Sequence, residues 1–251
     1  MTRSANGYFK PLDCEPDEKV HIVVPYHERP SELLLFLFIM HGLLQLQRVQ
    51  YDIVLIEPKG NGLFKRGHLF NAYYMESSKQ LSDNSPECLS IHDVDKIPSN
   101  LQLRYNCEFR PVQLARQFKT FNFTENGLLQ QMNNQKMYPG FMGGATLINR
   151  WDYWLLNGFS NLFDGWGGED DDLFLRTKIA RIPISEVDPK IGTFYHWMHS
   201  IENAVKDHRR KSKLKLPAVW TNMLMHGLAQ TEYSSVEIQS FTLYTKYHVI
   251  Y

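Results

Sequence analysis

Four consecutive carboxylates, Glu169-Asp170-Asp171-Asp172, are the residues of this chain best suited to chemistry. Like charges this close repel one another, so a fold keeps such a run where a cation, a helix N-terminus or substrate hydroxyls use it. The preceding residues, Gly165-Trp166-Gly167-Gly168, permit sharp backbone turns and offer a flat indole face suited to a sugar ring. The stretch therefore predicts a sugar-handling site, whereas an isolated acid run would predict only a solvated helix start.

Other residues could bind a divalent metal ion and a diphosphate. Asp93-Val94-Asp95 follows a β-rich run, and two oxygen donors at a strand end can hold Mn²⁺ or Mg²⁺. His196 and His199 would add imidazole ligands, which suit Mn²⁺ better than Ca²⁺. Arg29 and Arg66 could contact phosphate or uracil. Each feature is common by chance, so ordinary histidines and surface ion pairs remain the alternatives.

The elements that must position these groups are typical of an α/β fold with a mainly parallel sheet. Strands are expected at residues 21–25, 51–56 and 89–92, with helices at 32–47, capped by Ser31, and at 64–78. Ligands of such sheets bind beyond the carboxyl ends of the strands, where residues 25–29 and 93–95 lie.

The second half of the chain is less regular. Strands are expected at 143–149 and 191–196, a short helix at 150–156 and the acid-led helix at 169–180. Residues 236–251 alternate apolar and polar side chains and predict one or two antiparallel strands. Gly143-Gly144, preceded by Phe141, allows either a ligand or a neighbouring helix to come close.

Composition bounds the class of protein. The 251 residues carry 27 Lys+Arg against 27 Asp+Glu, so charge gives no reason to expect nucleic acid or an anionic membrane as a partner. No stretch reaches the ~18 apolar residues of a membrane helix, and the first six residues do not resemble a signal peptide. Three cysteines leave at least one without an intrachain partner. Asn122-Phe123-Thr124 is a glycosylation sequon, which matters only in a secretory protein.

Taken in order, these motifs resemble the β-1,4-galactosyltransferase family of metal-dependent, inverting glycosyltransferases with the GT-A fold. The resemblance covers nearly the whole chain. It rests on residues 7–14, Pro25-Tyr26-His27-Glu28-Arg29, Phe64-Lys65-Arg66, Asp93-Val94-Asp95, Gly143-Gly144, residues 157–161, Gly165 to Asp172, His226-Gly227-Leu228, Tyr233 and Leu243-Tyr244-Thr245. It implies one catalytic domain over 1–251, with a nucleotide-binding half at 1–135 and an acceptor-binding, catalytic half at 136–251.

The resemblance also implies a role for individual residues. Asp170 matches the catalytic base, and Asp95, His196 and His199 match the Mn²⁺ site, where His196 replaces a methionine usual in the family. Gly168, Glu169 and Asp171 match residues that hold sugars. The positions that match the UDP-sugar site are Pro25, Tyr26, His27, Arg29, Phe64, Arg66, Asp93, Val94, Phe141, Gly144 and Trp166, the last on a mobile loop that closes over the donor.

Three positions depart from the family pattern. His27 stands where an arginine is common, and Asp164 stands where a second tryptophan is usual. Phe141 replaces a tyrosine that helps to choose the donor sugar, and its ring leaves little room for an N-acetyl group. The expected donor is therefore UDP-galactose rather than UDP-N-acetylgalactosamine.

The resemblance implies a Cys88–Cys107 disulfide and matches Cys14 to a residue whose partner lies upstream of this sequence. Disulfides indicate a secretory compartment. The family consists of Golgi proteins with an N-terminal membrane anchor, and no anchor is present here. The expected location is therefore the Golgi lumen.

The leading hypothesis is transfer of galactose, with inversion, to the 4-hydroxyl of a terminal N-acetylglucosamine on a glycoprotein, glycolipid or proteoglycan. UDP-N-acetylgalactosamine or UDP-glucose are alternative donors, and glucose or xylose are alternative acceptors. A catalytically silent carbohydrate-binding protein and a nucleotide-binding regulatory domain are rivals from other classes. Residues 200–220 depart most from the family and are expected to shape the acceptor pocket.

Overall fold

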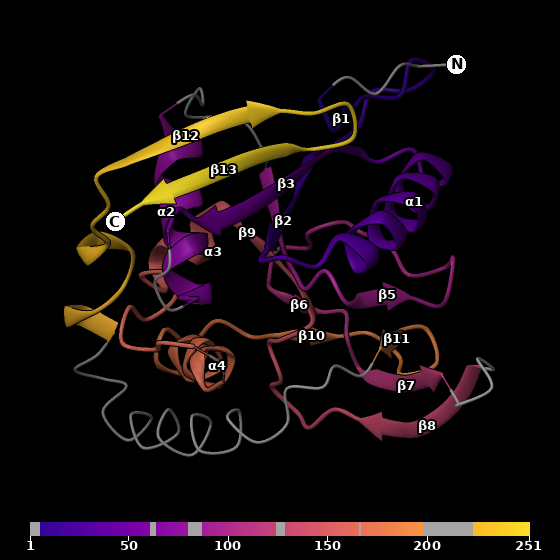
Figure 1. The fold of residues 1–251 in the computed structure, drawn as a ribbon. Helices are drawn as coiled ribbons and strands as arrows, with labels where there is room; N and C mark the ends of the chain where they lie inside the picture. Colours follow the sequence, from indigo (N-terminus) through magenta and orange to yellow (C-terminus); the bar gives the residue numbers. More distant parts are fainter. Residues whose placement is uncertain (1–5, 61–63, 80–86, 124–128, 166, 198–222) are drawn as a thin grey trace.

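The computed structural model describes residues 6–60, 64–79, 87–123, 129–165, 167–197 and 223–251. Within these ranges a nine-stranded mixed sheet forms the centre, and a four-stranded sheet lies at one end of the molecule (Figure 1). The large sheet has the strand order β10-β6-β9-β4-β2-β3-β13-β12, and β1 pairs with β3. This confirms the expected mixed α/β architecture, and strands from both halves of the chain contribute to one sheet.

Three parallel strands lie in the middle of the large sheet. They are β2 (Lys19–Pro25), β3 (Gln50–Pro58) and β4 (Glu87–His92), and they match the three strands expected in the first half. A fourth strand, β13 (Thr245–Ile250), runs parallel to β3. The remaining strands of the sheet are β1 (Tyr8–Phe9), β6 (Val112–Gln113), β9 (Ala145–Asn149), β10 (Ser185–Glu186) and β12 (Ser235–Ser240). The expected C-terminal antiparallel pair, β12 with β13, is confirmed.

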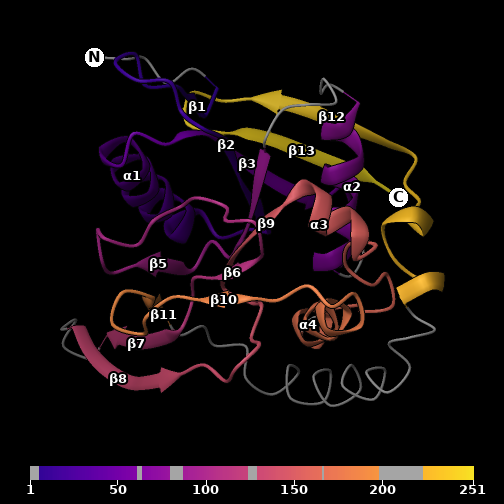
Figure 2. The ribbon, with the colours of Figure 1, turned by 180° about the vertical axis from the view of Figure 1, so that it is seen from behind.

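Helices cover both faces of the large sheet. In β2, alternate residues point to opposite faces: Ile22 and Val24 pack in one core with α1 (Pro30–Leu46), and Val23 packs in a second core. That second core contains α2 (Arg66–Ser78) and α3 (Arg150–Leu155). The acid-led helix α4 (Glu169–Ile179) lies at the same end of the molecule as the small sheet (Figure 2). No helix in the described ranges is both long and apolar enough to cross a membrane.

The start of α1 differs from the expectation. The helix begins at Pro30, so Ser31 lies inside it, and Arg29 occupies the cap position without a side-chain cap hydrogen bond. Proline suits the first helical position because its fixed φ matches the helix and its missing N–H has no intrahelical partner there. Ser31 as the cap is therefore wrong. Helix α2 begins at Arg66, two residues later than expected.

The small sheet is the main element that the sequence did not predict. It has the order β5-β11-β7-β8 and contains β5 (Lys96–Pro98), β11 (Thr193–Trp197), β7 (Gln117–Phe123) and β8 (Leu129–Lys136). Only β11 was expected. Strand β8 shows no apolar alternation because its described side chains are exposed on both faces.

A disulfide joins Cys88, at the start of β4, to Cys107 in the loop beyond β5, with the two Cα atoms 5.5 Å apart. This confirms the expected pair. The Glu18 carboxylate accepts the Cys107 N–H at 2.7 Å, and burial raises the pKa of that carboxyl to about 7. Cys14 forms no disulfide within the described part of the chain.

The amino ends of the three central strands hold a buried cluster of charges. His21 Nδ1 lies 2.8 Å from Asp52 Oδ1, and His21 Nε2 lies 3.2 Å from Glu87 Oε1. Lys19 Nζ contacts the other Asp52 oxygen at 2.6 Å, and Arg150 contacts the other Glu87 oxygen at 3.3 Å. Each carboxylate therefore has a cationic side chain in addition to the histidine.

Candidate active site

The acid-led helix begins where the sequence predicts. Gly167 and Gly168 have φ values of 97° and 99°, a left-handed conformation that favours glycine, and α4 starts directly after them at Glu169. All four acids thus lie in the first helical turn, where the positive end of the helix dipole stabilises negative charge. The helix dipole therefore stabilises the acidic run, whatever chemical role its residues have.

Arg66 connects the two acidic motifs. Its Nη2 lies 2.9 Å from Asp93 Oδ1, and its Nη1 lies 3.5 Å from Glu169 Oε1. The guanidinium group also lies 5.6 Å and 5.7 Å from the ring centroids of Phe70 and Phe159. Since Arg66 is buried, it holds the Asp93-Val94-Asp95 turn next to the start of α4.

Asp95 lies beyond the carboxyl end of β4 within a group of cationic and imidazole side chains. Arg29 Nη1 contacts Asp95 Oδ2 at 2.9 Å, and Lys96 Nζ contacts Asp95 Oδ1 at 2.8 Å. His196 Nε2 lies 3.6 Å from Asp95 Oδ2, because β11 pairs with β5 and places His196 opposite Lys96. The sequence predicted Asp95 with His196 but missed Lys96, since a lysine beside two acids is common on surfaces.

Asp95 and His196 fit a divalent metal ion. Their nearest donor atoms are 3.6 Å apart, and a carboxylate oxygen with an imidazole nitrogen is a donor set that Mn²⁺ accepts. The buried Asp95 carboxylate contacts the cationic side chains of Arg29 and Lys96. His199, the third expected ligand, and Met198 lie outside the described residues.

Asp170 is a half-buried carboxylate whose pKa is raised, first by its partial burial and then by the nearby charge of Asp171. Its Oδ1 accepts the Asp171 N–H at 3.0 Å. A Cβ on Gly143 would lie 2.8 Å from Asp170 Oδ2 and 2.6 Å from the Phe141 ring. The space at Gly143 thus accommodates these two side chains, and a pKa shifted toward neutrality suits a general base.

Glu169 is buried, and burial followed by the charge of Asp170 raises its pKa to about 7. Its Oε1 faces Arg66, whereas its Oε2 has no hydrogen-bond partner among the described residues. A buried oxygen without a partner is costly to the fold. A sugar hydroxyl would supply the missing hydrogen bond.

Asp171 is positioned by a residue that the sequence did not single out. The Tyr138 hydroxyl donates to Asp171 Oδ1 at 2.5 Å, and the Tyr138 ring packs edge-on against Phe141 at 5.5 Å between centroids. Phe141 packs in the same way against Phe118 at 5.9 Å. Tyr138 precedes the Gly143-Gly144 pair in a loop without periodicity, so only its aromatic character could have indicated a role.

Asp172 has a structural partner instead of a chemical role. Its Oδ2 lies 2.6 Å from Arg176 Nε, and both side chains are fully buried. Arg176 also donates to four backbone carbonyls, those of Leu156, Asn157, Gly158 and His226. The fourth acid therefore fastens α4 to two loops, beyond the helix-start role expected for it.

The expected donor-binding residues gather at the carboxyl ends of β2 and β4. Pro25 ends β2, and the N–H of the buried Tyr26 donates to the Ile56 carbonyl at 2.9 Å. The Tyr26 hydroxyl accepts the Arg29 N–H at 3.1 Å. Val94 is buried, whereas the exposed His27 ring lies 6.3 Å from that of Phe64.

The loop before α4 is attached to the segment before α2. The Gly165 N–H donates to the Phe64 carbonyl at 3.1 Å, and Lys65 forms an ion pair with Asp164 at 3.3 Å. Asp164, which replaces a family tryptophan, thus has a partner in this chain. Trp166 itself lies outside the described residues.

Two family models match the chain. The N-terminal region of glycosyl transferase group 7 matches residues 2–108, and a model described as the N-terminal domain of galactosyltransferase matches residues 128–200. The chain belongs to the β-1,4-galactosyltransferase family.

Curated members of the galactosyltransferase family are about 30% identical to the chain. It is 31% identical over 242 residues to β-1,4-galactosyltransferase 4 of Homo sapiens, and the aligned region covers 96% of this chain and 65% of that protein. It is 32% identical over 227 residues to β-1,4-galactosyltransferase 3 of Mus musculus, and the aligned region covers 89% of this chain and 54% of that protein. The chain thus spans less than two thirds of the length of these relatives.

Solved galactosyltransferases share the fold. The Drosophila β-1,4-galactosyltransferase 7 mutant in complex with manganese, UDP-Gal and xylobiose has a TM-score of 0.69 at 23% identity, covering 93% of this chain and 94% of that one. The catalytic domain of the same enzyme with xylobiose has a TM-score of 0.66 at 24% identity, with the same coverage. The expected GT-A fold is confirmed.

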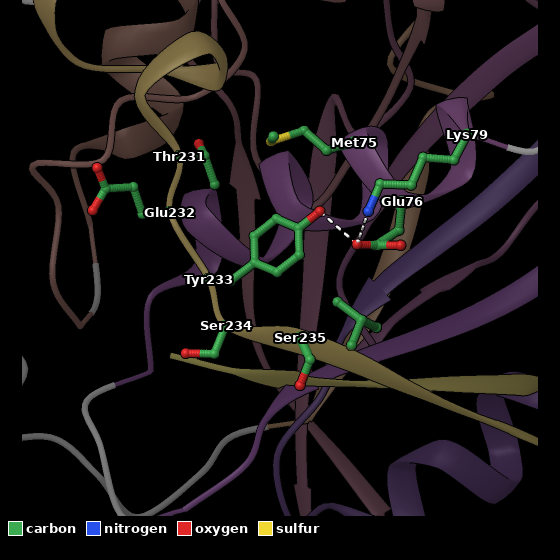
Figure 3. A pocket seen from close by; sticks show the side chains of 9 residues that line it. Met75, Glu76, Lys79, Thr231, Glu232, Tyr233, Ser234 and Ser235 are labelled. Atoms are coloured by element: carbon green, nitrogen blue, oxygen red, sulfur yellow. Dashed lines mark hydrogen bonds and ion pairs between the residues drawn. The ribbon is translucent and has the colours of Figure 1, made fainter.

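An open pocket of this galactosyltransferase-family chain lies at the far end of α2 from Arg66 (Figure 3). There Glu76 accepts hydrogen bonds from Tyr233 and Lys79, both at 2.6 Å, and the last turn of α2 faces the segment before β12. The polar atoms of this trio satisfy one another, and none of the acids of the candidate site lines the pocket. The expected donor and acceptor site is therefore elsewhere.

Proposed function

We propose that the chain is a β-1,4-galactosyltransferase that moves galactose from UDP-galactose to the 4-hydroxyl of a terminal sugar, with inversion. The observation that carries the proposal is the position of Asp170. Its half-buried carboxylate, with a raised pKa, lies at the start of α4, which Arg66 joins to the Asp93-Val94-Asp95 turn. A base placed beside a nucleotide-diphosphate site is what this transfer requires.

In the proposed reaction Asp170 accepts the proton of the acceptor hydroxyl as that oxygen attacks the anomeric carbon. Glu169, with its unpartnered oxygen, and Asp171, held by Tyr138, would bind sugar hydroxyls on either side. Asp95, His196 and, by resemblance, His199 would hold Mn²⁺. When bound, the ion offsets the negative charge of the leaving diphosphate. The manganese in the Drosophila complex supports a divalent metal in this fold.

UDP-galactose is the proposed donor. The names of the relatives and the UDP-Gal in the Drosophila complex support it over UDP-glucose, and the bulk of Phe141 also supports it over UDP-N-acetylgalactosamine. N-acetylglucosamine on a glycoprotein, glycolipid or proteoglycan is the proposed acceptor. Xylose is the second candidate, because the Drosophila enzyme was crystallised with xylobiose.

We also propose the Golgi lumen as the location. The Cys88–Cys107 disulfide supports an oxidising compartment, and the family resemblance supports the Golgi. In that compartment Asn122 would be a glycosylation acceptor; its side chain lies outside the described part of the structure.

A transfer assay tests the function directly. The purified chain is given UDP-galactose, UDP-N-acetylgalactosamine or UDP-glucose with Mn²⁺, and N-acetylglucosamine, glucose or xylose as acceptor. Transfer from UDP-galactose that stops with a chelator and returns with added Mn²⁺ is expected. A chain that binds UDP-galactose and sugar but transfers nothing would instead be a carbohydrate-binding protein.

A further inference from the structure

Helix α3 carries two tryptophans that the roles above do not use. Trp151 and Trp154 are 65% and 53% exposed. Residues three apart lie on the same face of a helix, and the two indole rings stack with 5.0 Å between their centroids and 27° between their planes. Tryptophan is highly buried on average in folded proteins. An exposed pair of tryptophans on one helix therefore indicates a role outside the core.

The packing of α3 fixes this pair on the surface. Tyr153, which lies between the two tryptophans in the sequence, is buried, and its hydroxyl donates to Asn71 Oδ1 at 2.7 Å. At the start of the helix, the Asn149 side chain accepts the Asp152 N–H at 2.7 Å. A rotation of α3 that buried the tryptophans would expose Tyr153 and break its hydrogen bond. The exposure of the pair is therefore a property of the fold.

The spacing of the two tryptophans matches a modification signal of the secretory pathway. Trp151-Asp152-Tyr153-Trp154 has the pattern W-x-x-W, in which a membrane-bound transferase of that pathway attaches mannose to C2 of the first indole ring. The donor is a polyprenyl phosphate mannose. A C–C bond forms between indole C2 and the anomeric carbon of mannose, and the bond from that carbon to the phosphate oxygen breaks. The lipid phosphate leaves with the electron pair, and the proton of C2 passes to a base of the transferase, so no oxidant or reductant is needed.

The folded chain has room for a mannose on Trp151. The sugar replaces one hydrogen atom of a ring that is mostly exposed, whereas the buried ring of Tyr153 would have no space for it. The mannose hydroxyls would also make the exposed apolar patch of the stacked pair more polar, and such patches are otherwise an aggregation liability. The Cys88–Cys107 disulfide supports passage through the oxidising compartment in which the transferase acts.

We propose that Trp151 is a C-mannosylation site, which the transferase recognises through Trp154. The proposal goes beyond the sugar transfer that the chain itself performs, and it rests on the proposed secretory location. Here the chain is the acceptor of a sugar, at a carbon atom remote from Asp170. An unmodified pair would remain an apolar surface suited to contact with another protein, and the experiment distinguishes that outcome.

Tandem mass spectrometry of the full chain tests the site. The chain is expressed behind a signal peptide in an animal cell line, together with a reporter protein that the same cells C-mannosylate. The tryptic peptide of residues 151–176 is analysed from secreted and cell-retained protein alike. We expect the mass of one hexose on Trp151, and fragmentation within the sugar ring because the C–C bond resists cleavage. Trp151→Phe and Trp154→Ala should both lose the hexose. Leu155→Ala, which truncates another exposed apolar side chain of α3, is the matched control and should keep it.

A wild-type peptide without the hexose, in cells that modify the reporter, would overturn the proposal. So would a hexose on Ser160 that is released whole, since that behaviour indicates a sugar bonded to oxygen, or a hexose that persists on Trp151 in Trp154→Ala. The Cys88–Cys107 disulfide, read in the same digest, identifies the molecules that reached the oxidising compartment, and occupancy is measured on these. The result does not depend on whether the chain transfers galactose, so failure of the site and failure of the proposed function are separate outcomes.

Discussion

The acidic side chains at the two ends of the central strands differ in how their charges are compensated. At the amino ends, the Asp52 and Glu87 carboxylates each contact His21 and a second cation, so the charges compensate one another. At the carboxyl ends, the pKa values of Glu169 and Asp170 are raised, whereas that of Asp52 at the amino ends is lowered. Among the described residues, Glu169 Oε2 and Glu87 Oε2 both lack a hydrogen bond, but Glu87 Oε2 has Arg150 at 3.3 Å. The first end contributes to stability, whereas the second gives up stability to keep acids ready for a substrate.

Asp170→Asn should give the largest effect and separate the two ends most clearly. We expect transfer to fall about 10³-fold, because a positioned base contributes about 10²–10⁴. The free energy of unfolding should stay the same or rise, because the fold disfavours the ionised carboxylate and the amide removes that charge. Steady-state kinetics and urea denaturation of the same preparation measure both. Unchanged transfer would show that another group is the base.

Glu87→Gln should show the reverse pattern. Removing one carboxylate leaves His21 and Arg150 incompletely paired inside the protein, and breaking a buried ion pair costs about 3–5 kcal/mol. Activity per folded molecule should not change, because the cluster is at the opposite end of the strands from Asp170. Glu237→Gln, which breaks an exposed pair with Lys59, is the control and should leave the urea midpoint in place. A loss of kcat in Glu87→Gln would contradict the division between the two ends.

The disulfide tests the same end by a covalent route. Cys88→Ser/Cys107→Ser opens a loop with a sequence separation of 19 residues, and we expect a loss of about 3 kcal/mol. Thermal unfolding of the variant and of wild type with reductant should agree. Strand β4 leads from Cys88 to the Asp93-Val94-Asp95 turn. If the double variant, assayed at a low temperature at which it is folded, keeps the wild-type KM for UDP-galactose, the disulfide is not needed to position that turn.

The pH dependence should differ in sign between stability and activity. Burial lowers the pKa of His21, but the charges of Asp52 and Glu87 outweigh it, so its pKa in the folded chain lies above the ordinary value. The stabilisation is then complete below about pH 6.5, the unfolded value, and is lost as pH rises through the folded pKa. Lys19 and Tyr73 also face this histidine.

Transfer should instead rise with pH as Asp170 loses its proton, because its pKa is raised. We expect the melting temperature to decrease as pH rises through the folded-state pKa of His21, while kcat/KM increases as pH rises through the raised pKa of Asp170. In His21→Gln the decrease in melting temperature should become smaller. A melting temperature that rises with pH in wild type but not in the variant would contradict the assignment to His21.

The sequence predicted the elements whose residues carry a local signal. The apolar runs of β2, β3 and β4 and the glycines before Glu169 fixed the centre of the sheet and the start of α4. The disulfide followed from the family resemblance, because neither spacing nor composition could select it. The Asp95–His196 pair was suggested by the acids at a strand end and by the imidazoles, and the resemblance supported it. Asn157 and Gly158, whose carbonyls accept from Arg176, belong to a matched motif that gave no hint of this contact.

The elements and site residues that the sequence did not predict are those whose structure depends on their contacts in the folded chain. Strand β8 has exposed residues on both faces and no apolar alternation to reveal it, and in β7 the two alternate buried positions, Phe118 and Thr120, are not both apolar. The spacing of Asp172 and Arg176 is that of an ordinary surface pair on a helix, and only the carbonyls around Arg176 show that the pair is internal. Lys96 belongs to the site through its contact with the adjacent Asp95, a pair that forms no recognisable motif. Tyr138 belongs to it through a contact with Asp171, which lies far away in the sequence.

The position of β13 has a consequence for biosynthesis. This strand, near residue 250, lies in parallel beside β3, near residue 55, and only β12 lies outside it at that edge. During translation the edge of β3 from Val54 to Pro58 therefore stays unpaired until nearly two hundred more residues (β3 to β13) have been made. The nascent protein is thus expected to depend on chaperones until its last strand emerges, and premature stop codons even a few residues upstream of β13 should lead to aggregation rather than to a shortened enzyme.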